Sequence, residues 1–439
     1  MIYLGLLFFF VLEYVRIGSF VPGVEALHLN SVLPAAVFLG TVFATRPVSN
    51  GDALREPNTK LFLLLLGLIV ASVVVADLTM AVVETLTMVL GYVLVYYVIL
   101  RQATDLVRIK GVFAVMIFVH LAMIALTPEL LTSPGQRHYV AYGTFLGDGN
   151  DFSLSIDVAM PLCLFLLSDA RKLSGKMLAG ASLLLLLLAV VATQSRGGTL
   201  GLAAVGLYYW WKSPRKLATG AGVIVALVVA LAFAPQQYFQ RMDTISSYET
   251  DGSAQGRISA WKAGTAMMLS NPLFGVGAGQ FPSNYTRFAP SEVGWKTAHS
   301  IYFLILGELG LPGFVLLLSI IFYNLAANRR LARRLSAETA VPPTRSLRLL
   351  AALSASLIAF AVAGAFLSAL YYPHLYVVAG LLAAGRRVAE QEAALAPALA
   401  PAMAAVLAPS PLAPLTTVVP APPRRPVGTV TLTQHGRFF

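Results

Sequence analysis

Charged residues are scarce in this sequence. Of its 439 residues, 12% are charged and 57% are hydrophobic, whereas a soluble domain carries about a quarter charged residues. The mean hydropathy is +0.75, so the chain has more apolar surface than it could bury in water, and lipid is the solvent that suits it. Segments of alternating polarity, which a membrane barrel needs, are absent. The composition therefore predicts an all-α polytopic membrane protein.

Features that would indicate other functions are also missing. Cys163 is the only cysteine, which excludes a disulfide-stabilised secreted domain. The phosphate-binding motif G-x-x-x-x-G-K-[ST] does not occur, which argues against an ATP-driven transporter. The 6 histidines have no metal-ligand spacing, and no Ser/His/Asp hydrolase motif is present. We therefore expect neither a metal nor a cofactor.

The sequence does contain long apolar runs, close to the length of about 20 residues that a helix needs to cross a bilayer. These runs predict a transmembrane domain over 1–385 with about twelve spans. The remaining segment, 386–439, is rich in Ala and Pro, and we expect it to be a disordered cytoplasmic tail. The predicted spans are 2–20, 29–45, 61–77, 79–100, 111–127, 150–168, 177–195, 197–211, 217–234, 299–325, 347–368 and 371–385.

The net charge of +11 raises the question of nucleic-acid binding, but the distribution of the charge indicates membrane topology instead. One set of alternate loops, together with the tail, holds 23 of the 31 Lys and Arg residues. Because basic residues are retained in the cytoplasm, both termini are predicted to lie there. The longest loop, 235–298, then faces outward, and loop 128–150 is the second outer surface.

Arg196 lies in the turn Thr193–Gly198 between two apolar helices, at the outer edge of the bilayer. No acidic residue stands beside it, and the glycines that follow, Gly197 among them, allow close backbone approach and amides that face an anion. The alternative is an arginine that extends to lipid phosphates without further function.

Arg257 lies at the start of an expected amphipathic helix over 257–269. Its apolar residues Ile258, Trp261, Met268 and Leu269 fall on one face, which is typical of a helix on the outer membrane surface. The amides of a helix start favour anions. An ordinary interfacial anchor remains the alternative.

His299 stands where the long loop re-enters the membrane, and a neutral imidazole there can take a proton near neutral pH. A hydrogen-bonded interface histidine is the alternative.

Three weaker patterns complete the survey. The glycine-rich stretch 275–279 has no preceding strand, and we interpret it as a flexible turn. Asp148, Asp151 and Asp157 can be read as divalent-metal ligands, but polar helix capping is the favoured interpretation. Glu308 lies inside a predicted span, where an acid is functional by default unless it pairs with a nearby Arg or a helix end.

Two arginines and a histidine on one side of the membrane suit a membrane-bound anion and a hydroxyl that must lose a proton. A lipid diphosphate sugar fits, because its diphosphate is already a good leaving group and arginine binds phosphate with two parallel bonds. The charge that develops on the leaving diphosphate would be stabilised in a site from which water is partly excluded.

The residues that carry these features resemble the O-antigen ligase/polymerase superfamily of bacterial envelope glycan assembly. The resemblance extends over about 190–315 and rests on RGGTLGL, RMDTISSYETDGSAQGRISAW, NPLFGVGAGQF and AHSIYFLILGELGLPG. The string GNDFSLSIDVAMPL at 149–162 is similar to the branch of O-glycosylation ligases and exopolysaccharide polymerases. Ser300 departs from the Asn that many members have after the histidine, which bears on the choice of acceptor.

The resemblance implies a metal-independent, inverting glycosyltransferase of the bacterial inner membrane that acts on undecaprenyl diphosphate at the periplasmic face. Arg196, Arg257 and Gly197 would bind the diphosphate, and His299 would be the base. The acceptor would be lipid A core, protein or another lipid-linked glycan, so ligase and polymerase both remain open. Secondary candidates are Gln194, Arg287, Lys296, Arg137 and Glu308.

Two other classes of function remain as alternatives. A flippase of lipid-linked sugars should show an internal repeat with broken helices at midplane, and no repeat is visible in the sequence. A non-catalytic scaffold would use the long outer loop as a docking surface, and it should tolerate replacement of His299 by Ala.

The distribution of basic residues leads to a test of topology. Reporter fusions at about residue 250 and at the C-terminus should report opposite sides of the membrane, because the positive-inside rule places loop 235–298 outside and both termini inside. The same side for both fusions would mean that the span count is wrong by one, and Arg196 and His299 would no longer share a face.

Overall fold

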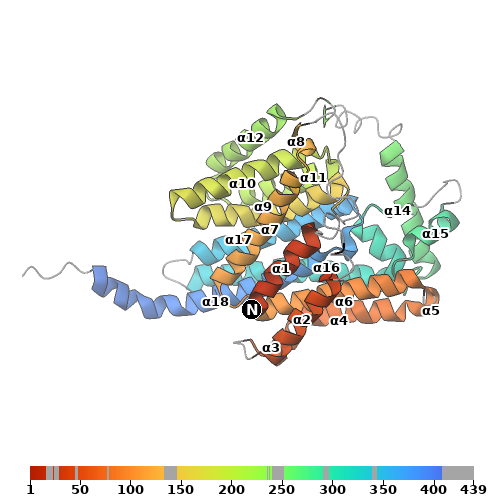
Figure 1. The fold of residues 1–439 in the computed structure, drawn as a ribbon, viewed down its shortest axis with the longest axis horizontal. Coiled ribbons are helices and arrows are strands. Elements are labelled where there is room, and N and C mark those ends of the chain that lie inside the picture. Colours follow the sequence, from red (N-terminus) through yellow and green to blue (C-terminus); the bar gives the residue numbers. More distant parts are fainter. Residues whose placement is uncertain are drawn as a thin grey trace, which may run out of the picture. The chain divides into compact units, whose positions relative to one another are not determined.

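The computed structural model describes residues 1–15, 23, 29–44, 48–76, 79–132, 146–234, 236, 238–239, 252–289, 296–338 and 344–407, with the side chains of 30, 31, 253 and 396–407 left out. The chain divides into a large unit, Met1–Ala394, and a second unit, Leu395–Phe439. Over the described residues the secondary structure is helical, without a strand (Figure 1).

The helices of the first half lie close together along the chain. They are α1 (Ile2–Val15), α2 (Leu29–Phe43), α3 (Asn50–Arg55), α4 (Pro57–Ala71), α5 (Val73–Ala76), α6 (Met80–Gln102), α7 (Leu106–Leu126), α8 (Glu129–Thr132), α9 (Gly149–Asp169) and α10 (Leu173–Ala192).

The second half contains the longest helices and two short 3-10 turns. These elements are α11 (Arg196–Lys212), α12 (Lys216–Ala232), α14 (Gly252–Ser270), α15 (Phe281–Phe288), α16 (Ile301–Glu338), α17 (Thr344–Ala363), η3 (Gly364–Phe366), η4 (Ala369–Tyr371) and α18 (Pro373–Leu407).

Each of the twelve predicted spans overlaps a helix of the structure. Among the described residues, 7 helical segments are long and apolar enough to cross a membrane, and 3 more are apolar but shorter. The chain therefore has the character of a multi-pass membrane protein, and the count of twelve remains a prediction. The 7 segments are Pro57–Ala76, Met80–Gln102, Leu106–Leu126, Gly149–Asp169, Leu173–Ala192, Ile301–Glu338 and Thr344–Phe366.

Side-chain caps explain where several of these helices begin. The carboxylate of Asp105 accepts a hydrogen bond from the Arg108 amide at 3.0 Å at the start of α7. Asp148 does the same for α9, accepting from the Asn150 amide at 2.9 Å. Such caps satisfy amides that have no partner within the helix. The capping interpretation of Asp148 is confirmed.

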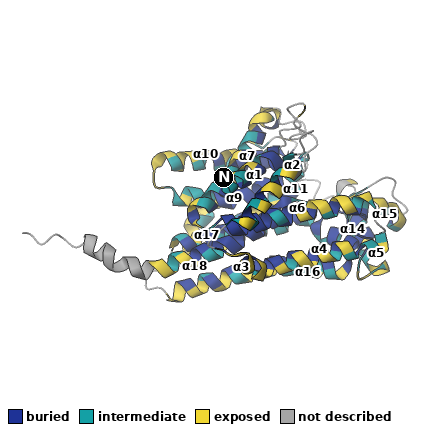
Figure 2. Cartoon of the chain, turned by 60° about the horizontal axis from the view of Figure 1, so that its bottom comes forward, coloured by how far each residue is buried: buried dark blue, intermediate teal, exposed yellow. Residues whose placement is uncertain are grey.

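The interior is built around α9 and α17, which pack against each other and against α11. Buried positions line the inner sides of the helices, and exposed ones follow the outer sides of α4, α10 and α16 (Figure 2). Gly198 and Gly201 permit the close approach of α11, since a Cβ at either would overlap Ser153 or Asp157 of α9. Small residues at such crossings are typical of helix packing in membranes.

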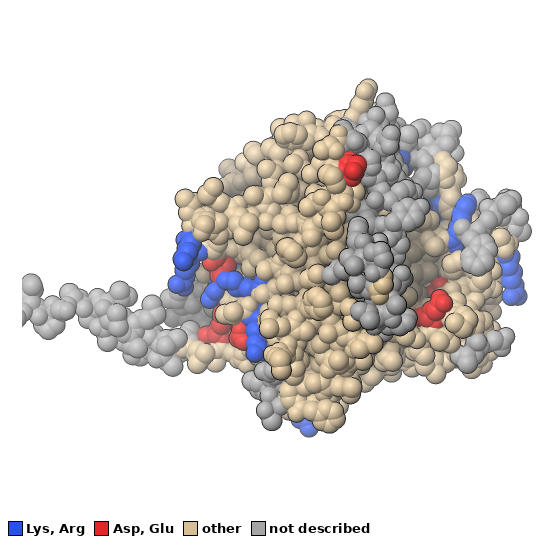
Figure 3. Space-filling view, in the orientation of Figure 1, with Lys and Arg blue, Asp and Glu red and all other residues tan. Residues whose placement is uncertain are grey.

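Large apolar side chains remain exposed on several helices, as lipid contact requires. On α12, Ile224 and Val225 are each 61% exposed, and on α4, Leu63 and Leu64 are exposed as well. Figure 3 shows a broad uncharged surface between groups of basic side chains. A soluble monomer rarely presents so much apolar surface, so these faces fit a bilayer.

Helix α16 is interrupted at Gly310, which has a φ of 62° and precedes Pro312 by two residues. A proline has no N–H, so the carbonyl of Glu308 loses its regular helical donor. The chain supplies replacements from the segment before α15: the Val276 amide bonds the Gly307 carbonyl at 2.9 Å, and the Gly277 amide bonds the Glu308 carbonyl at 2.9 Å.

This pairing corrects the interpretation of the glycine-rich stretch as a flexible turn. Gly275, Gly277 and Gly279 all have positive φ, and a Cβ at Gly275 would overlap the Gly307 carbonyl oxygen. The glycines therefore serve close backbone contact, and the turn is fixed against the break in α16.

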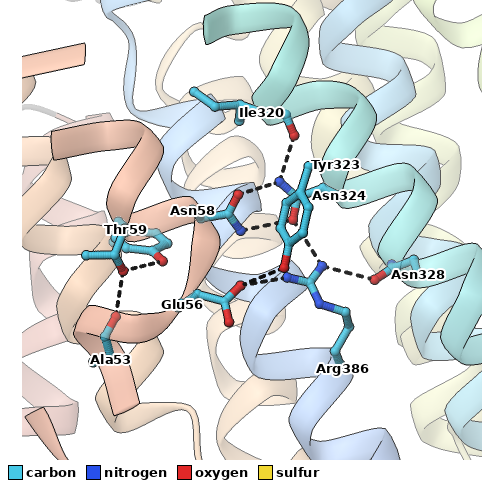
Figure 4. Close-up of polar contacts among 10 residues, drawn as sticks. Ala53, Glu56, Asn58, Thr59, Ile320, Tyr323, Asn324, Asn328 and Arg386 are labelled. Carbon is cyan, nitrogen blue, oxygen red and sulfur yellow. Dashed lines mark hydrogen bonds and ion pairs between the residues drawn. The ribbon is translucent and has the colours of Figure 1, made fainter. Parts of the chain in front are cut away.

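A polar network joins α16 to α18 and to the segment at the start of α4 (Figure 4). The guanidinium of Arg386 bonds Glu56 at 2.9 Å and the side-chain oxygen of Asn324 at 3.0 Å. The side-chain amides of Asn58 and Asn324 bond each other reciprocally at 3.0 and 2.8 Å. Mutual pairing of this kind satisfies polar groups that would otherwise be costly between apolar helices.

Helix α18 continues beyond residue 385, where the last span was expected to end, and reaches Leu407. The helix thus covers the first part of the segment expected to be a disordered tail, and the division of the chain at residue 385 stays a prediction. Two causes are evident: alanine, which is abundant here, is the best helix former, and Arg386 and Arg387 bind the bundle, the latter through the Leu100 carbonyl at 2.6 Å. Residues 408–439 lie outside the described part of the chain.

The network yields a stability prediction. Arg386→Ala should destabilise the protein by about 3 kcal/mol, because Glu56 would lose its charged partner at a largely buried position. The measurement is thermal unfolding in detergent. Arg334→Ala is the matched control, since Arg334 and Glu390 form an exposed pair, worth about 1 kcal/mol at most. Equal losses of stability in the two variants would contradict the proposed contribution of the network.

Candidate functional site

Arg196 is the first residue of α11, in the position that the sequence indicated. Ser195 caps the helix by accepting a hydrogen bond from the Gly198 amide at 3.1 Å. Gln194 precedes the cap, is buried and has a φ of 55°, a conformation that is uncommon outside glycine. Arg196 is half-buried and shares the first turn of α11, where the helix dipole favours anions.

The absence of a side chain at Gly197 has a packing explanation. A Cβ there would lie 3.2 Å from the Cβ of Phe366 in η3, closer than most real contacts allow. The assignment of Gly197 to diphosphate binding rests on the resemblance alone and remains a prediction.

Arg257 lies in the second turn of α14, so the expected helix is present and extends over Gly252–Ser270. Helix α14 packs along α16, and its residues Ala260, Ala263 and Met267 are buried. Three of the apolar residues expected on one face, Ile258, Trp261 and Leu269, line an open groove together beside Phe303.

His299 directly precedes α16, and its backbone is held in an unusual conformation. It has a φ of 47°, and its amide donates to the Ser368 hydroxyl at 2.8 Å. That hydroxyl in turn donates to Thr297 at 2.9 Å. A left-handed non-glycine residue costs energy and persists only where its surroundings hold it. The residue His299 is exposed, although its neighbour Ser300 is buried.

The residues between α17 and α18, numbered 364–372 and called the α17–α18 connection below, contact the segments that carry all three candidates. Phe366 meets Gly197 and also the ring of Trp261, with centroids 6.4 Å apart. Ser368 holds the backbone of His299. One short connection thus brings together the start of α11, helix α14 and the start of α16.

This connection is the part of the site that the sequence did not reveal. Spans predicted at 347–368 and 371–385 left only two residues between them. The available signals were Gly364 and Pro373, which interrupt helices, and a polar Ser368 between them. None of these signals specifies a contact with residues far away in the sequence.

Glu308 is buried and accepts hydrogen bonds from three groups. Its carboxylate binds the amides of Gly279 at 2.9 Å and Phe281 at 3.0 Å, and the Tyr371 hydroxyl at 2.6 Å. Of the interpretations that the sequence allowed, pairing with a helix end is therefore confirmed, since Phe281 begins α15. Glu308 also fixes the α17–α18 connection through Tyr371.

The remaining candidates are dispersed. The ammonium of Lys296 lies 5.7 Å from the ring centroid of Tyr285. A Cβ at Gly256, the residue before Arg257, would lie 3.7 Å from the same ammonium. Lys296 is thus close to the start of α14. Arg287 lies over the ring of Phe288 at the end of α15. Arg137 lies outside the described residues.

The three aspartates do not come together as metal ligands. Asp148 caps α9, whereas Asp157 is buried beside Gly201 of α11. Within the described part of the chain, no group of three or more His, Cys, Asp or Glu side chains is arranged to hold a metal ion.

The comparison with protein families gives one match. Residues 181–318 match the family described as O-antigen ligase. This segment is a domain of the O-antigen ligase/polymerase superfamily. A comparison with curated proteins finds no match.

The match covers about a third of the chain and includes Arg196, Arg257, His299 and Glu308. The description of the matched family indicates, at a coarse level, a glycan-transferring membrane enzyme. The α17–α18 connection lies beyond the matched residues, although it contacts the segments that carry the first three of these residues.

The role of Ser368 can be tested without an activity assay. Ser368→Ala should speed hydrogen exchange of the amides at 297–300 about tenfold, because a lost hydrogen bond of about 1.4 kcal/mol releases this backbone. Mass spectrometry of exchanged peptides measures the effect. Ser368→Thr should retain the protection. Ser356→Ala, at a buried α17 serine, should leave exchange at 297–300 unchanged. Unaltered exchange in Ser368→Ala would refute the anchoring role.

Proposed function

We propose that this protein is an inner-membrane glycosyltransferase that moves a glycan from undecaprenyl diphosphate to an acceptor hydroxyl at the periplasmic face. The observation that carries this proposal is the α17–α18 connection, which contacts the three segments bearing Arg196, Arg257 and His299. The O-antigen ligase domain at 181–318 supports the class of reaction.

The two arginines are assigned to the donor. A diphosphate is charged before the reaction, and its leaving oxygen gains further charge in the transition state, so fixed cations favour both binding and turnover. Arg196 at the start of α11 adds the dipole of that helix, and Lys296 lies near Gly256, the residue before Arg257. In this scheme protein cations neutralise the diphosphate, and the reaction requires no metal.

His299 is assigned as the general base. Its imidazole takes the proton of the acceptor hydroxyl while that oxygen forms a bond to the anomeric carbon of the donor sugar. The bond from this carbon to the diphosphate breaks, and its electron pair leaves with the diphosphate. Attack from the side opposite the leaving group inverts the anomeric centre. The anchored backbone of His299 would hold the base in place for this step.

A polymerase of the same superfamily is the nearest alternative, since it differs only in taking another lipid-linked glycan as acceptor. A flippase has one feature in its favour, because α16 is interrupted at Gly310 and transporters use broken helices to bind substrates. Here, however, the chain's own Val276 and Gly277 amides bond the carbonyls at the break. Because these amides already satisfy the carbonyls, we favour a structural role for the break.

The two roles predict different defects. His299→Ala should slow transfer by about 10² to 10⁴, the usual contribution of a positioned base, with donor binding retained. Arg257→Ala should weaken both donor binding and turnover, and Arg257→Lys should restore little, because lysine lacks the planar fork. Purified protein with undecaprenyl-diphosphate glycan and a lipid A core acceptor, with and without EDTA, provides the assay.

Photo-crosslinking of a lipid diphosphate probe separates binding from chemistry in these variants. Loss of crosslinking in His299→Ala, with Arg257→Ala unchanged in both measurements, would reverse the assigned roles. Complete loss of wild-type transfer in EDTA, restored by magnesium, would contradict the metal-independent scheme.

A further inference from the structure

An open apolar groove of about 390 Å³ runs along α14 and is not used in the mechanism above. Trp261 and Phe303 form one wall, with their rings stacked at a centroid distance of 5.2 Å and an interplanar angle of 11°. Ala266 and Leu269 continue the lining, and Lys262 adds a cation. Leu269 is 68% exposed, so the groove opens to the surroundings of the protein.

The groove has a polar head and an apolar length, as helical geometry shows. Arg257, Trp261, Thr265 and Leu269 are spaced by four residues, which places them along one stripe of α14. From Arg257 to Leu269 this stripe is about 18 Å long. A ligand that fills it should carry an anionic group at one end of a long apolar chain.

The head of the groove adjoins the other proposed phosphate-binding element. Trp261, one turn after Arg257, contacts Phe366, and Phe366 packs on Gly197 beside Arg196. The anionic end of a chain lying in the groove would therefore be directed toward the region between α14 and the start of α11.

On the basis of this arrangement, and resting on the proposed function, we propose that the groove binds the isoprenoid chain of the lipid diphosphate donor. In such a donor the diphosphate is attached directly to the chain, so one molecule can place its anion at Arg257 and its chain along Trp261 and Leu269. In a glycolipid acceptor, sugars separate the acyl chains from the reacting hydroxyl, and the hydroxyl would lie too far from the head.

We expect binding of the chain to depend on how well it packs in the groove. A chain that leaves the bilayer for this groove exchanges one apolar environment for another, so the hydrophobic effect contributes little. Selectivity then depends on packing against Trp261, Phe303 and Ala266. A large side chain in the groove should therefore impair long-chain donors and affect short-chain donors little.

The test compares undecaprenyl and farnesyl diphosphate glycans as donors. Ala266→Trp should raise KM for the undecaprenyl donor about tenfold, equivalent to about 1.4 kcal/mol, and should leave the farnesyl donor nearly unchanged. Val315→Trp, at an exposed apolar position of α16 outside the groove, is the matched control and should change neither KM. Ala266→Leu provides a smaller obstruction if the tryptophan variant is unstable.

A second measurement does not depend on turnover. An undecaprenyl diphosphate probe with a photoreactive group in its chain should label peptides from α14 or the start of α16 in wild-type protein, and about tenfold less in Ala266→Trp, in line with the change in KM. Labelling confined to other helices, or an unchanged KM for both donors in Ala266→Trp, would overturn the groove assignment. Transfer by the wild type in the same assay would still support the proposed function. Failure of the wild type to transfer glycan from either donor, with α14 still labelled, would overturn the function and leave chain binding in place.

Discussion

The buried carboxylate of Glu308 determines how the parts around the candidate site fit together. It accepts hydrogen bonds from the amides of Gly279 and Phe281 and from the hydroxyl of Tyr371. These three partners belong to the glycine-rich turn, to α15 and to the α17–α18 connection. A carboxylate in an apolar interior is costly unless such donors satisfy it, so each partner depends on the others being in place.

The position of His299 follows from this arrangement. The same connection that Tyr371 fixes also carries Ser368, which holds the His299 amide, and Phe366, which packs between Gly197 and Trp261. The backbone of the proposed base is therefore held by the Ser368 hydroxyl, on a connection that the buried bond between Tyr371 and Glu308 fixes, while His299 itself remains exposed. Rigid support beneath an accessible group is what precise proton transfer requires.

The sequence was a good guide to the helices and to isolated polar residues at membrane edges, because both depend on local patterns. Apolar runs of bilayer length located the predicted spans. Arg196 and His299 were conspicuous as polar residues beside such runs, and Arg257 was conspicuous at the start of an amphipathic helix. Contacts between distant segments could not be predicted. Glu308 binds Tyr371 across 63 residues, and nothing near Ser368 indicates a histidine 69 residues earlier as its partner.

The hydrogen bonds that satisfy the backbone at the break in α16 limit how far the length of this region can change in evolution. Val276 and Gly277 bond two successive carbonyls, those of Gly307 and Glu308, while the Leu311 amide bonds the Pro272 carbonyl. Inserting or deleting one residue between Pro272 and Val276 would shift this alignment and leave buried backbone groups unpaired. Length variation among natural variants should therefore be excluded from this turn, so that adaptation to different glycans proceeds through loops elsewhere.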